Sequence, residues 1–346
     1  MTDPTRRLAP VVRLAPAKVN LTLAVLGTRQ DGYHELHSVM VPTGVADRLS
    51  VAVLPPGNAD TLHVDGFDPG PAADNLVLLA IAAARRAARE AGFGPEPPPP
   101  LAARLEKRIP VAAGLAGGSS DAYAALDAAL EAWGVELGAD ARHAVAAGLG
   151  SDVPFVAVGG PALVEGRGER LTPLAWLRDA AGWPDRPGLL LITPGVALST
   201  PAVFRAWDGG ARAPGGAARL ASAHLADELR RGMLTSDMLL VRASVLAAAN
   251  DLAPAAAAVE PALVPFKRAL LRLLARPVGV SGSGPTHWAL YASQVEAQEA
   301  ADRLRDALAA GEITAPGSRP PFIAATTIAA PAATDPATKP ASESQP

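Results

Sequence analysis

Cysteine is absent from this 346-residue chain. Disulfide bonds, thiolate nucleophiles and thiolate metal sites are therefore excluded. Aromatic residues are scarce, at 4% of the chain, with six Phe, three Tyr and five Trp. Long hydrophobic runs are also missing: no stretch of about 18 apolar residues is free of charge or proline, so no membrane-spanning helix is expected. The first residues lack the unbroken apolar segment of a signal peptide.

A surplus of positive charge is missing as well. The chain carries 31 Lys and Arg against 34 Asp and Glu, a formal net charge of −3. Nucleic-acid-binding proteins usually show a basic surface, so neither a nucleic acid nor a membrane is an expected partner. A site for a small anion needs only a few local donors and stays compatible with this composition. The composition thus indicates a globular, cytoplasmic protein and leaves its oligomeric state open.

The length suggests two lobes, because domains usually contain roughly 100–200 residues. We expect a loose N-terminal lead-in at 1–9, a first domain at 10–185 and a second at 186–328. Residues 329–346 are of low complexity and contain no aromatic residue. Such a segment cannot bury enough apolar surface to fold, so we expect a disordered tail.

The first polar pair lies in a predicted strand. From Val19 to Val25 aliphatic residues alternate with other residues, which is typical of a strand. Alternate residues of a strand share a face. Lys18 and Asn20 should therefore project together.

A glycine- and serine-rich loop follows at Ile109 and leads into a predicted helix that runs from about Ser120 to Trp133. Its glycines allow positive φ and a close approach to a ligand. A helix N-terminus has unpaired N–H groups and the positive end of a dipole, which attract phosphate. A tight turn before an ordinary core helix is the alternative. The candidate phosphate-binding residues are Pro110, Val111, Ala112, Ala113, Gly114, Leu115, Ala116, Gly117, Gly118, Ser119 and Ser120.

This loop resembles the ATP loop of the galactokinase, homoserine kinase, mevalonate kinase and phosphomevalonate kinase (GHMP) family. Ala116 stands where the family usually has glycine, so the backbone there must tolerate a Cβ atom. Asp121 would repel a polyphosphate unless its carboxylate points away or is neutralised. The segment from Ala15 to Val39, with Pro-Ala-Lys-x-Asn-Leu and then Arg-x-Asp-Gly-Tyr-His, resembles GHMP kinases that act on a cytidine-diphosphate-linked methylerythritol.

The resemblance implies two catalytic residues, Lys18 and Asp152. An aspartate after Gly-Ser, as Asp152 is, would by itself usually be a turn residue or a helix cap. The Gly-Ser-Asp-Val-Pro segment resembles the part of these kinases that carries the catalytic aspartate. Asp152 is therefore expected to be the base. Lys18 beside it would keep the carboxylate ionised and stabilise developing charge.

The resemblance also implies the substrate-binding residues. Asn20 would place the methylerythritol end, and Tyr33 and Phe204 would stack on the cytosine. His34 would hydrogen-bond to the polar edge of the base. Without its Thr-Pro-x-x-Phe context, Phe204 would more simply be a core residue. A late loop at 280–290 resembles the third family motif and is expected to close over the phosphates, whereas Asn250 is expected to be structural.

His63, His143 and His224 are scattered without a metal-binding spacing. The expected metal is Mg²⁺ that arrives with ATP, with Ser120 as the candidate protein ligand. The resemblance implies an α+β fold of two lobes, with the active site in the cleft between them. It also implies transfer of the γ-phosphoryl group of ATP to a hydroxyl of the cytidyl substrate. The alternatives are another small-molecule GHMP kinase and a non-enzymatic sensor with the same fold.

Overall fold

The structure is a computed structural model that describes residues 9–329, except 72–73, 95, 176, 178–185 and 211–215. The expected lead-in at 1–9 and tail at 329–346 lie outside the described residues, apart from Ala9 and Ala329. The division into domains at residue 185 falls within one of the gaps and stays a prediction. Among the described residues, no helix is both long and apolar enough to cross a membrane.

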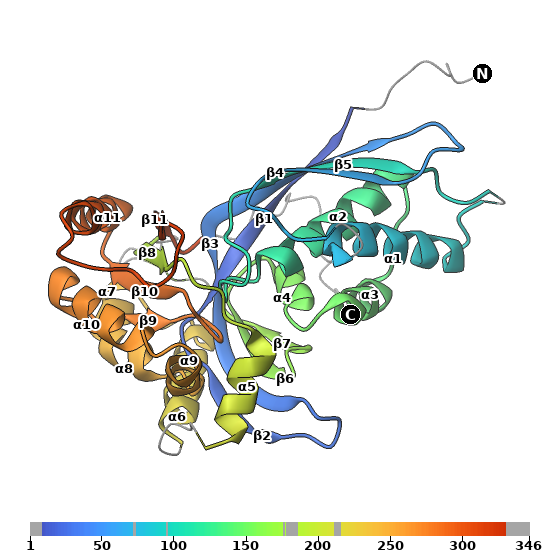
Figure 1. Ribbon diagram of the computed structural model, residues 1–346. Coiled ribbons are helices and arrows are strands. Elements are labelled where there is room, and N and C mark those ends of the chain that lie inside the picture. Colours follow the sequence, from blue (N-terminus) through green and yellow to red (C-terminus); the bar gives the residue numbers. More distant parts are fainter. Residues whose placement is uncertain are drawn as a thin grey trace, which may run out of the picture.

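A seven-stranded sheet forms the first half of the molecule. Its order is β4-β5-β3-β6-β7, and β1 and β2 also pair with β3. The long strand β3 is the central strand of this sheet, because its C-terminal half pairs with β5 and its N-terminal half pairs with β6. Figure 1 shows β3 and β1 running through the centre of the molecule. The strands are β1 (Val11–Asn20), β2 (Ala24–Thr28), β3 (His34–Val53), β4 (Thr61–Gly66), β5 (Leu101–Lys107), β6 (Ala162–Gly166) and β7 (Arg170–Pro173).

Two helices that pack side by side cover one face of this sheet (Figure 1). α1 (Leu76–Glu90) begins at Asn75, whose Oδ1 accepts a hydrogen bond from the backbone N–H of Val77 at 2.9 Å. The sequence predicts an alanine-rich helix from Leu76 to about Ala91 with Asp74 and Asn75 as candidate caps, and the structure confirms the helix and the cap by Asn75. α2 (Gly117–Trp133) is rich in alanine and packs closely against α1 and the aliphatic residues of β5. The shorter helices α3 (Ala139–Leu149) and α4 (Val153–Val158) complete this half.

A four-stranded sheet forms the second half, in the order β11-β8-β10-β9. The sequence predicts a short buried strand at 189–192 and a strand–turn–strand unit at 277–291, and β8, β9 and β10 confirm both. The strands are β8 (Gly188–Thr193), β9 (Gly279–Val280), β10 (His287–Tyr291) and β11 (Phe322–Thr327). The helices are α5 (Thr200–Asp208), α6 (Ala217–Arg230), α7 (Ser236–Val241), α8 (Ala243–Ala248), α9 (Ala253–Val259), α10 (Leu263–Leu274) and α11 (Gln294–Ala309).

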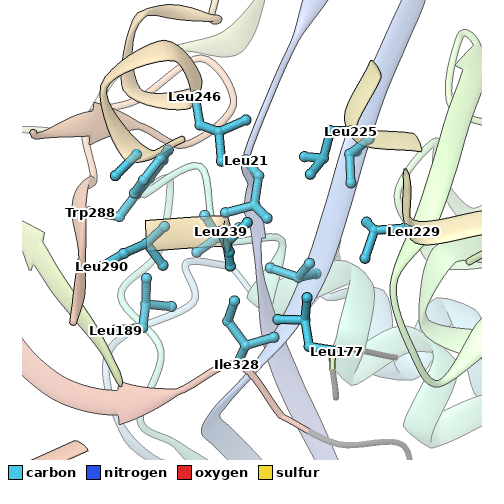
Figure 2. Close-up of a cluster of buried hydrophobic side chains, with 14 of the residues drawn as sticks. Leu21, Leu177, Leu189, Leu225, Leu229, Leu239, Leu246, Trp288, Leu290 and Ile328 are labelled. Carbon is cyan, nitrogen blue, oxygen red and sulfur yellow. The ribbon is translucent and has the colours of Figure 1, made fainter. Parts of the chain in front are cut away.

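The central strand β8 is apolar on both faces because both faces are covered. Leu190 and Ile192 pack with residues of α10 and α11. Leu189 and Leu191 point the other way, into a cluster with Leu21 that also contains Trp288 of β10. Figure 2 shows Leu21 surrounded by side chains from α6, α7, α8 and β10. Each buried leucine contributes ~1.5–3 kcal/mol. This shared core fixes the two sheets relative to each other.

Three details differ from the sequence predictions. The N-terminal extended segment is interrupted at residues 21–23 and forms two strands. The face with Lys18 and Asn20 is also buried, because the second half of the molecule covers it. In addition, the helix predicted to begin at about Ser120 begins three residues earlier, at Gly117, after a residue in left-handed conformation. The α+β fold itself is confirmed.

Candidate active site

The glycine-rich loop takes an unusual backbone path before α2. Ala112, Gly114 and Ala116 all have positive φ, at 53°, 77° and 53°. At Gly114 a Cβ atom would lie 2.4 Å from the carbonyl oxygen of Ser281, so glycine is required there. Ala116 adopts the left-handed conformation in spite of its Cβ atom, at a cost of about 1–2 kcal/mol. Such a path directs main-chain groups towards a ligand at the start of the helix.

The late loop supports this path from the second half of the molecule. Ser281 Oγ donates to the carbonyl oxygen of Gly114 at 2.9 Å, and the N–H of Thr286 donates to that of Ala113 at 3.3 Å. The amide of Asn250 in turn donates to the carbonyl oxygens of Val280 and Gly282 at 2.8 and 2.9 Å. Asn250 is therefore structural, as predicted, and the two glycine loops form one unit.

A buried ionic cluster lies beneath the loop. The ammonium of Lys107 contacts the carboxylate of Asp47 and lies 2.7 Å from Oδ2 of Asp121. Asp47 also accepts the backbone N–H of Ile109 at 2.8 Å. Burial raises the pKa of Asp121 to about 7, against the opposing effect of the Lys107 ammonium. The carboxylate of Asp121 is thus turned towards Lys107, which offsets the repulsion of a bound polyphosphate.

Lys18 and Asp152 meet at the other side of the loop. Lys18 Nζ lies 3.5 Å from Asp152 Oδ2 and donates to Asn20 Oδ1 at 2.7 Å. Asn20 Nδ2 donates in turn to Ser38 Oγ at 2.8 Å, which fixes the orientation of the amide. The Lys18 side chain is buried, whereas that of Asp152 is 31% exposed. Asp152 precedes α4 but makes no capping hydrogen bond, so its carboxylate is available to a ligand.

A cluster of rings lies further along the same surface. The rings of His34 and Phe204 stack with centroids 4.5 Å apart, and His34 Nε2 lies 3.0 Å from Asp208 Oδ1. Tyr33 is 52% exposed. The guanidinium of Arg167 lies 5.2 Å from the centre of the Tyr33 ring. One face of Phe204 is therefore occupied by His34 itself, and Tyr33 is the ring with the more accessible surface.

One cavity of about 820 Å³ connects these groups. The structure therefore brings together nearly all the residues that the sequence singled out. The predicted residues on its wall are Lys18, Asn20, Tyr33, His34, Pro110, Val111, Ala112, Ala113, Gly114, Ala116, Gly117, Gly118, Ser119, Asp152 and Phe204. Leu115 is not on the wall, because its side chain belongs to the core, although its carbonyl oxygen accepts the N–H of Lys18.

Sequence reasoning missed several residues of the wall. Lys107 and Arg167 are the most informative, since each carries a positive charge into the cavity. A signal for both exists: Lys107 directly precedes the glycine loop, and Arg167 lies between two glycines in a turn. Asn75 was predicted only as a helix cap and also lines the cavity. Cations beside glycine turns could thus have been selected from the sequence.

The described residues were predicted to offer one metal ligand, Ser120. Among the described residues, no group of three or more His, Cys, Asp or Glu could hold a metal ion. The predicted ligand Ser120 is fully buried, does not line the cavity, and its Oγ has no hydrogen-bond partner.

Family models support the class of protein that this fold and cavity define. The model of the GHMP kinases N terminal domain matches residues 75–160, which include the glycine loop and Asp152. The model of the GHMP kinases C terminal domain matches residues 226–310, which include the late loop. The two halves of the molecule are thus those of a GHMP kinase.

Curated relatives narrow the class further. The 4-diphosphocytidyl-2-C-methyl-D-erythritol kinase of Pelotomaculum thermopropionicum is 38% identical over 85% of this chain and 94% of its own length. That of Deinococcus radiodurans is 37% identical over 92% of this chain and 97% of its own length. The chain belongs to the family of 4-diphosphocytidyl-2-C-methyl-D-erythritol kinases.

Solved structures agree with this assignment. A 4-(cytidine 5'-diphospho)-2C-methyl-D-erythritol kinase superposes with a TM-score of 0.66 and 32% identity, over 92% of this chain and all of the other. The homoserine kinase of Cytophaga hutchinsonii superposes with a TM-score of 0.62 at 16% identity, over 95% of this chain and 98% of the other. The second similarity is one of fold.

Proposed function

We propose that this chain transfers the γ-phosphoryl group of ATP to the 2-hydroxyl of 4-diphosphocytidyl-2-C-methyl-D-erythritol, a step in the non-mevalonate route to isoprenoid precursors. The observation that carries the proposal is that Lys18 and Asp152 form a close pair in the same cavity as a loop built for phosphate. An ATP-dependent kinase needs this combination, because phosphoryl transfer depends on positioning and charge stabilisation.

The glycine loop and the start of α2 are proposed to hold the phosphates of ATP. The first N–H groups of a helix have no partner within it, and at α2 they follow the positive-φ residues of the loop. The buried cluster of Lys107, Asp47 and Asp121 supports this end from beneath. It also brings an ammonium within 2.9 Å of the position that a Cβ atom of Gly117 would occupy.

Asp152 is proposed to accept the proton of the attacking hydroxyl. Its partly exposed carboxylate can reach a substrate, while the buried ammonium of Lys18 is held by Asn20 on the other side. Lys18 would favour the ionised carboxylate before the reaction and balance charge on the transferred group during it. Asn20 donates to Ser38 with one end of its amide, so it is a rigid positioning group for Lys18 and the methylerythritol end.

Mg²⁺ is proposed to enter as its ATP complex. The oxygen ligands would come from the phosphates and water, since no set of protein carboxylates is in place among the described residues. Bound there, the ion would neutralise charge on the transferred phosphoryl group. We also propose that the enzyme works in the cytoplasm, where both ATP and Mg²⁺ are supplied.

The cytosine is proposed to stack on Tyr33, with His34 and Phe204 beside it. Tyr33 offers an exposed ring, and the His34 imidazole is fixed by Asp208 and by its contact with Phe204. A fixed imidazole can hydrogen-bond to the polar edge of a pyrimidine. This end of the cavity favours the cytidyl substrate over homoserine, mevalonate or a sugar, none of which contains an aromatic ring.

A wild-type assay tests the proposal. Purified enzyme is supplied with ATP and Mg²⁺ and one of five acceptors: the cytidyl substrate, methylerythritol phosphate, mevalonate, homoserine or galactose. ADP release is expected with the cytidyl substrate, at most weakly with methylerythritol phosphate, and not with the other three. Efficient turnover of one of those three would refute the substrate while keeping the kinase class. No turnover of any acceptor would favour a sensor protein.

A further inference from the structure

The turn between β6 and β7 contacts both the end of the cavity at Asp152 and the end at Tyr33. At Gly168 a Cβ atom would lie 2.7 Å from the carbonyl oxygen of Ser151, so the turn packs directly on the residue before Asp152. The carboxylate of Glu169 accepts the backbone N–H of Arg167 at 2.7 Å and closes the turn on itself. The backbone of Arg167 lies between these two contacts and is therefore held close to Asp152.

The side chain of Arg167 extends from this turn to the other end. Its guanidinium lies over the Tyr33 ring, 5.2 Å from the centroid, and the residue is half-buried on the cavity wall. A guanidinium attracted to the face of a ring does not use its N–H groups in that contact, so they remain able to donate to a ligand. It also covers one face of Tyr33, which leaves the opposite face for a base.

The charges of the wall single out this residue. Four lysine or arginine side chains line the cavity in the described part of the chain: Lys18, Lys107, Arg167 and Arg205. Lys18 is paired with Asp152, and Lys107 with Asp47 and Asp121. Neither Arg167 nor Arg205 forms an ion pair with a described residue. The pKa of the nearby Asp31 carboxyl is nevertheless lowered by the backbone N–H of Tyr33 and, to a smaller extent, by the charge of Arg167. Of these two, Arg167 has both the contact to Tyr33 and the turn packed on Ser151.

We propose that Arg167 binds the diphosphate that links the cytidine to the methylerythritol in the second substrate. This inference rests on the proposed function. A substrate with its base on Tyr33 and its hydroxyl at Asp152 must carry its two phosphates between these points, where Arg167 lies. The planar fork of a guanidinium matches phosphate oxygens with two parallel hydrogen bonds. Binding would use an N–H edge that has no acceptor among the described residues.

Ligand charge provides the test. Cytidine, CMP and CDP are titrated against wild type, Arg167→Ala and Arg167→Lys at saturating ADP, so that the nucleotide loop is occupied. In wild type, affinity is expected to rise from cytidine to CDP. Arg167→Ala should lose about 10-fold or more of its affinity for CDP, the size of a charge-assisted hydrogen bond, and much less for cytidine. Arg167→Lys should retain part of the preference for CDP.

Arg170→Ala is the matched control. Arg170 lies on the same turn, three residues away, but pairs with Glu35 and does not line the cavity. It should keep the wild-type preference for CDP, and all variants should keep their KM for ATP and their melting temperature. An equal loss for cytidine and CDP would mean that Arg167 acts only through Tyr33 and would overturn the inference. An unchanged preference in Arg167→Ala would do so too.

Failure of the proposed function looks different. Wild type would then bind neither cytidine nor CDP and would not turn over the cytidyl substrate. A wild type that turns over this substrate but binds CDP no better than cytidine would overturn the role of Arg167 alone.

Discussion

The two ends of the cavity differ in construction: the end at the glycine loop, proposed for the nucleotide, and the end at Tyr33, proposed for the cytidine. The nucleotide end is formed by the positive-φ loop and the start of α2, supported by the buried side chains of Asp47, Lys107 and Asp121. The cytidyl end is formed by aromatic side chains, of which Tyr33 is 52% exposed. One end is part of the core, whereas the other is a set of rings and charges at its surface.

This difference separates stability from specificity. A main-chain phosphate site works only if its path is held in place, so its supporting residues belong to the folding core. A base is recognised by ring faces and edges, which a few side chains can provide without structural support. Substitutions at the nucleotide end should therefore affect folding, and those at the cytidyl end should affect turnover of one substrate.

The largest effect is expected at Lys107. Replacement by Met removes the cation between two buried carboxylates. Breaking a buried ion pair on one side typically costs about 3–5 kcal/mol, so Lys107→Met should lower the free energy of unfolding by that amount. Urea denaturation measures it. The double variant Lys107→Met/Asp121→Asn is the control and should recover part of the loss. An unchanged unfolding midpoint in the single variant would contradict the structural role.

Asp152→Asn should affect catalysis without affecting folding. The side chain is partly exposed and makes no capping hydrogen bond, so the fold and ATP binding should persist. Loss of a general base usually lowers kcat by about 10²-fold or more. Steady-state kinetics on the cytidyl substrate, together with an ATP titration, check both expectations. A variant with nearly wild-type kcat would show that another group takes the proton.

Tyr33→Ala should affect only the cytidyl end. Loss of one stacking contact costs about 1–3 kcal/mol, which should appear in kcat/KM for the cytidyl substrate. Tyr33→Phe keeps the ring and should behave nearly like wild type. The KM for ATP and the melting temperature should not change in either variant. A matching loss of ATP affinity would mean that the two ends are not separate.

The sequence predicted the nucleotide end of the cavity more completely than the cytidyl end. The glycine loop is a short contiguous motif whose suitability for phosphate follows from local geometry. Lys18 and Asp152 were assigned from short motifs that resemble those of the family, and the structure places all of them on one cavity. The sequence could not predict the ionic partners of Asp121. Asp47 lies 74 positions earlier, and the folded sheet brings both carboxylates to Lys107. For the same reason the sequence did not show that His34 stacks on Phe204, 170 positions away. This contact occupies one of the ring faces that were expected to bind the cytosine.

Fold prediction shows the same limit. Alternation and glycine turns predicted β8 and the β9–β10 unit, because these patterns are local. They did not predict that the Lys18 face of β1 would be covered, since the covering comes from the second half of the chain. Because of this cover the Lys18 side chain is buried. Asn20 orients it by accepting a hydrogen bond from its ammonium.

The smallest effect is expected from the titration of Asp121. Burial raises its pKa from 3.8 to about 7. The neighbouring carboxylate of Asp47 also raises this pKa, whereas the Lys107 ammonium lowers it. The native state therefore keeps a proton that the unfolded state has released. The stabilising effect is complete below about pH 4 and is lost as the pH rises through about 7.

Asp121→Asn removes this titration and leaves Lys107 paired with Asp47. The difference in free energy of unfolding between pH 6 and pH 8 should shrink by about 1.4 kcal/mol in the variant, since pH 6 lies one unit below the folded-state pKa of about 7 and one pKa unit corresponds to about 1.4 kcal/mol. Denaturation curves at both pH values, for wild type and variant, measure it. At pH 8 the variant should be at least as stable as wild type, because wild type then buries two carboxylates against one ammonium. A variant with the wild-type pH dependence would mean that the proton belongs to another group, and the nucleotide end would then be no more sensitive to pH than the cytidyl end.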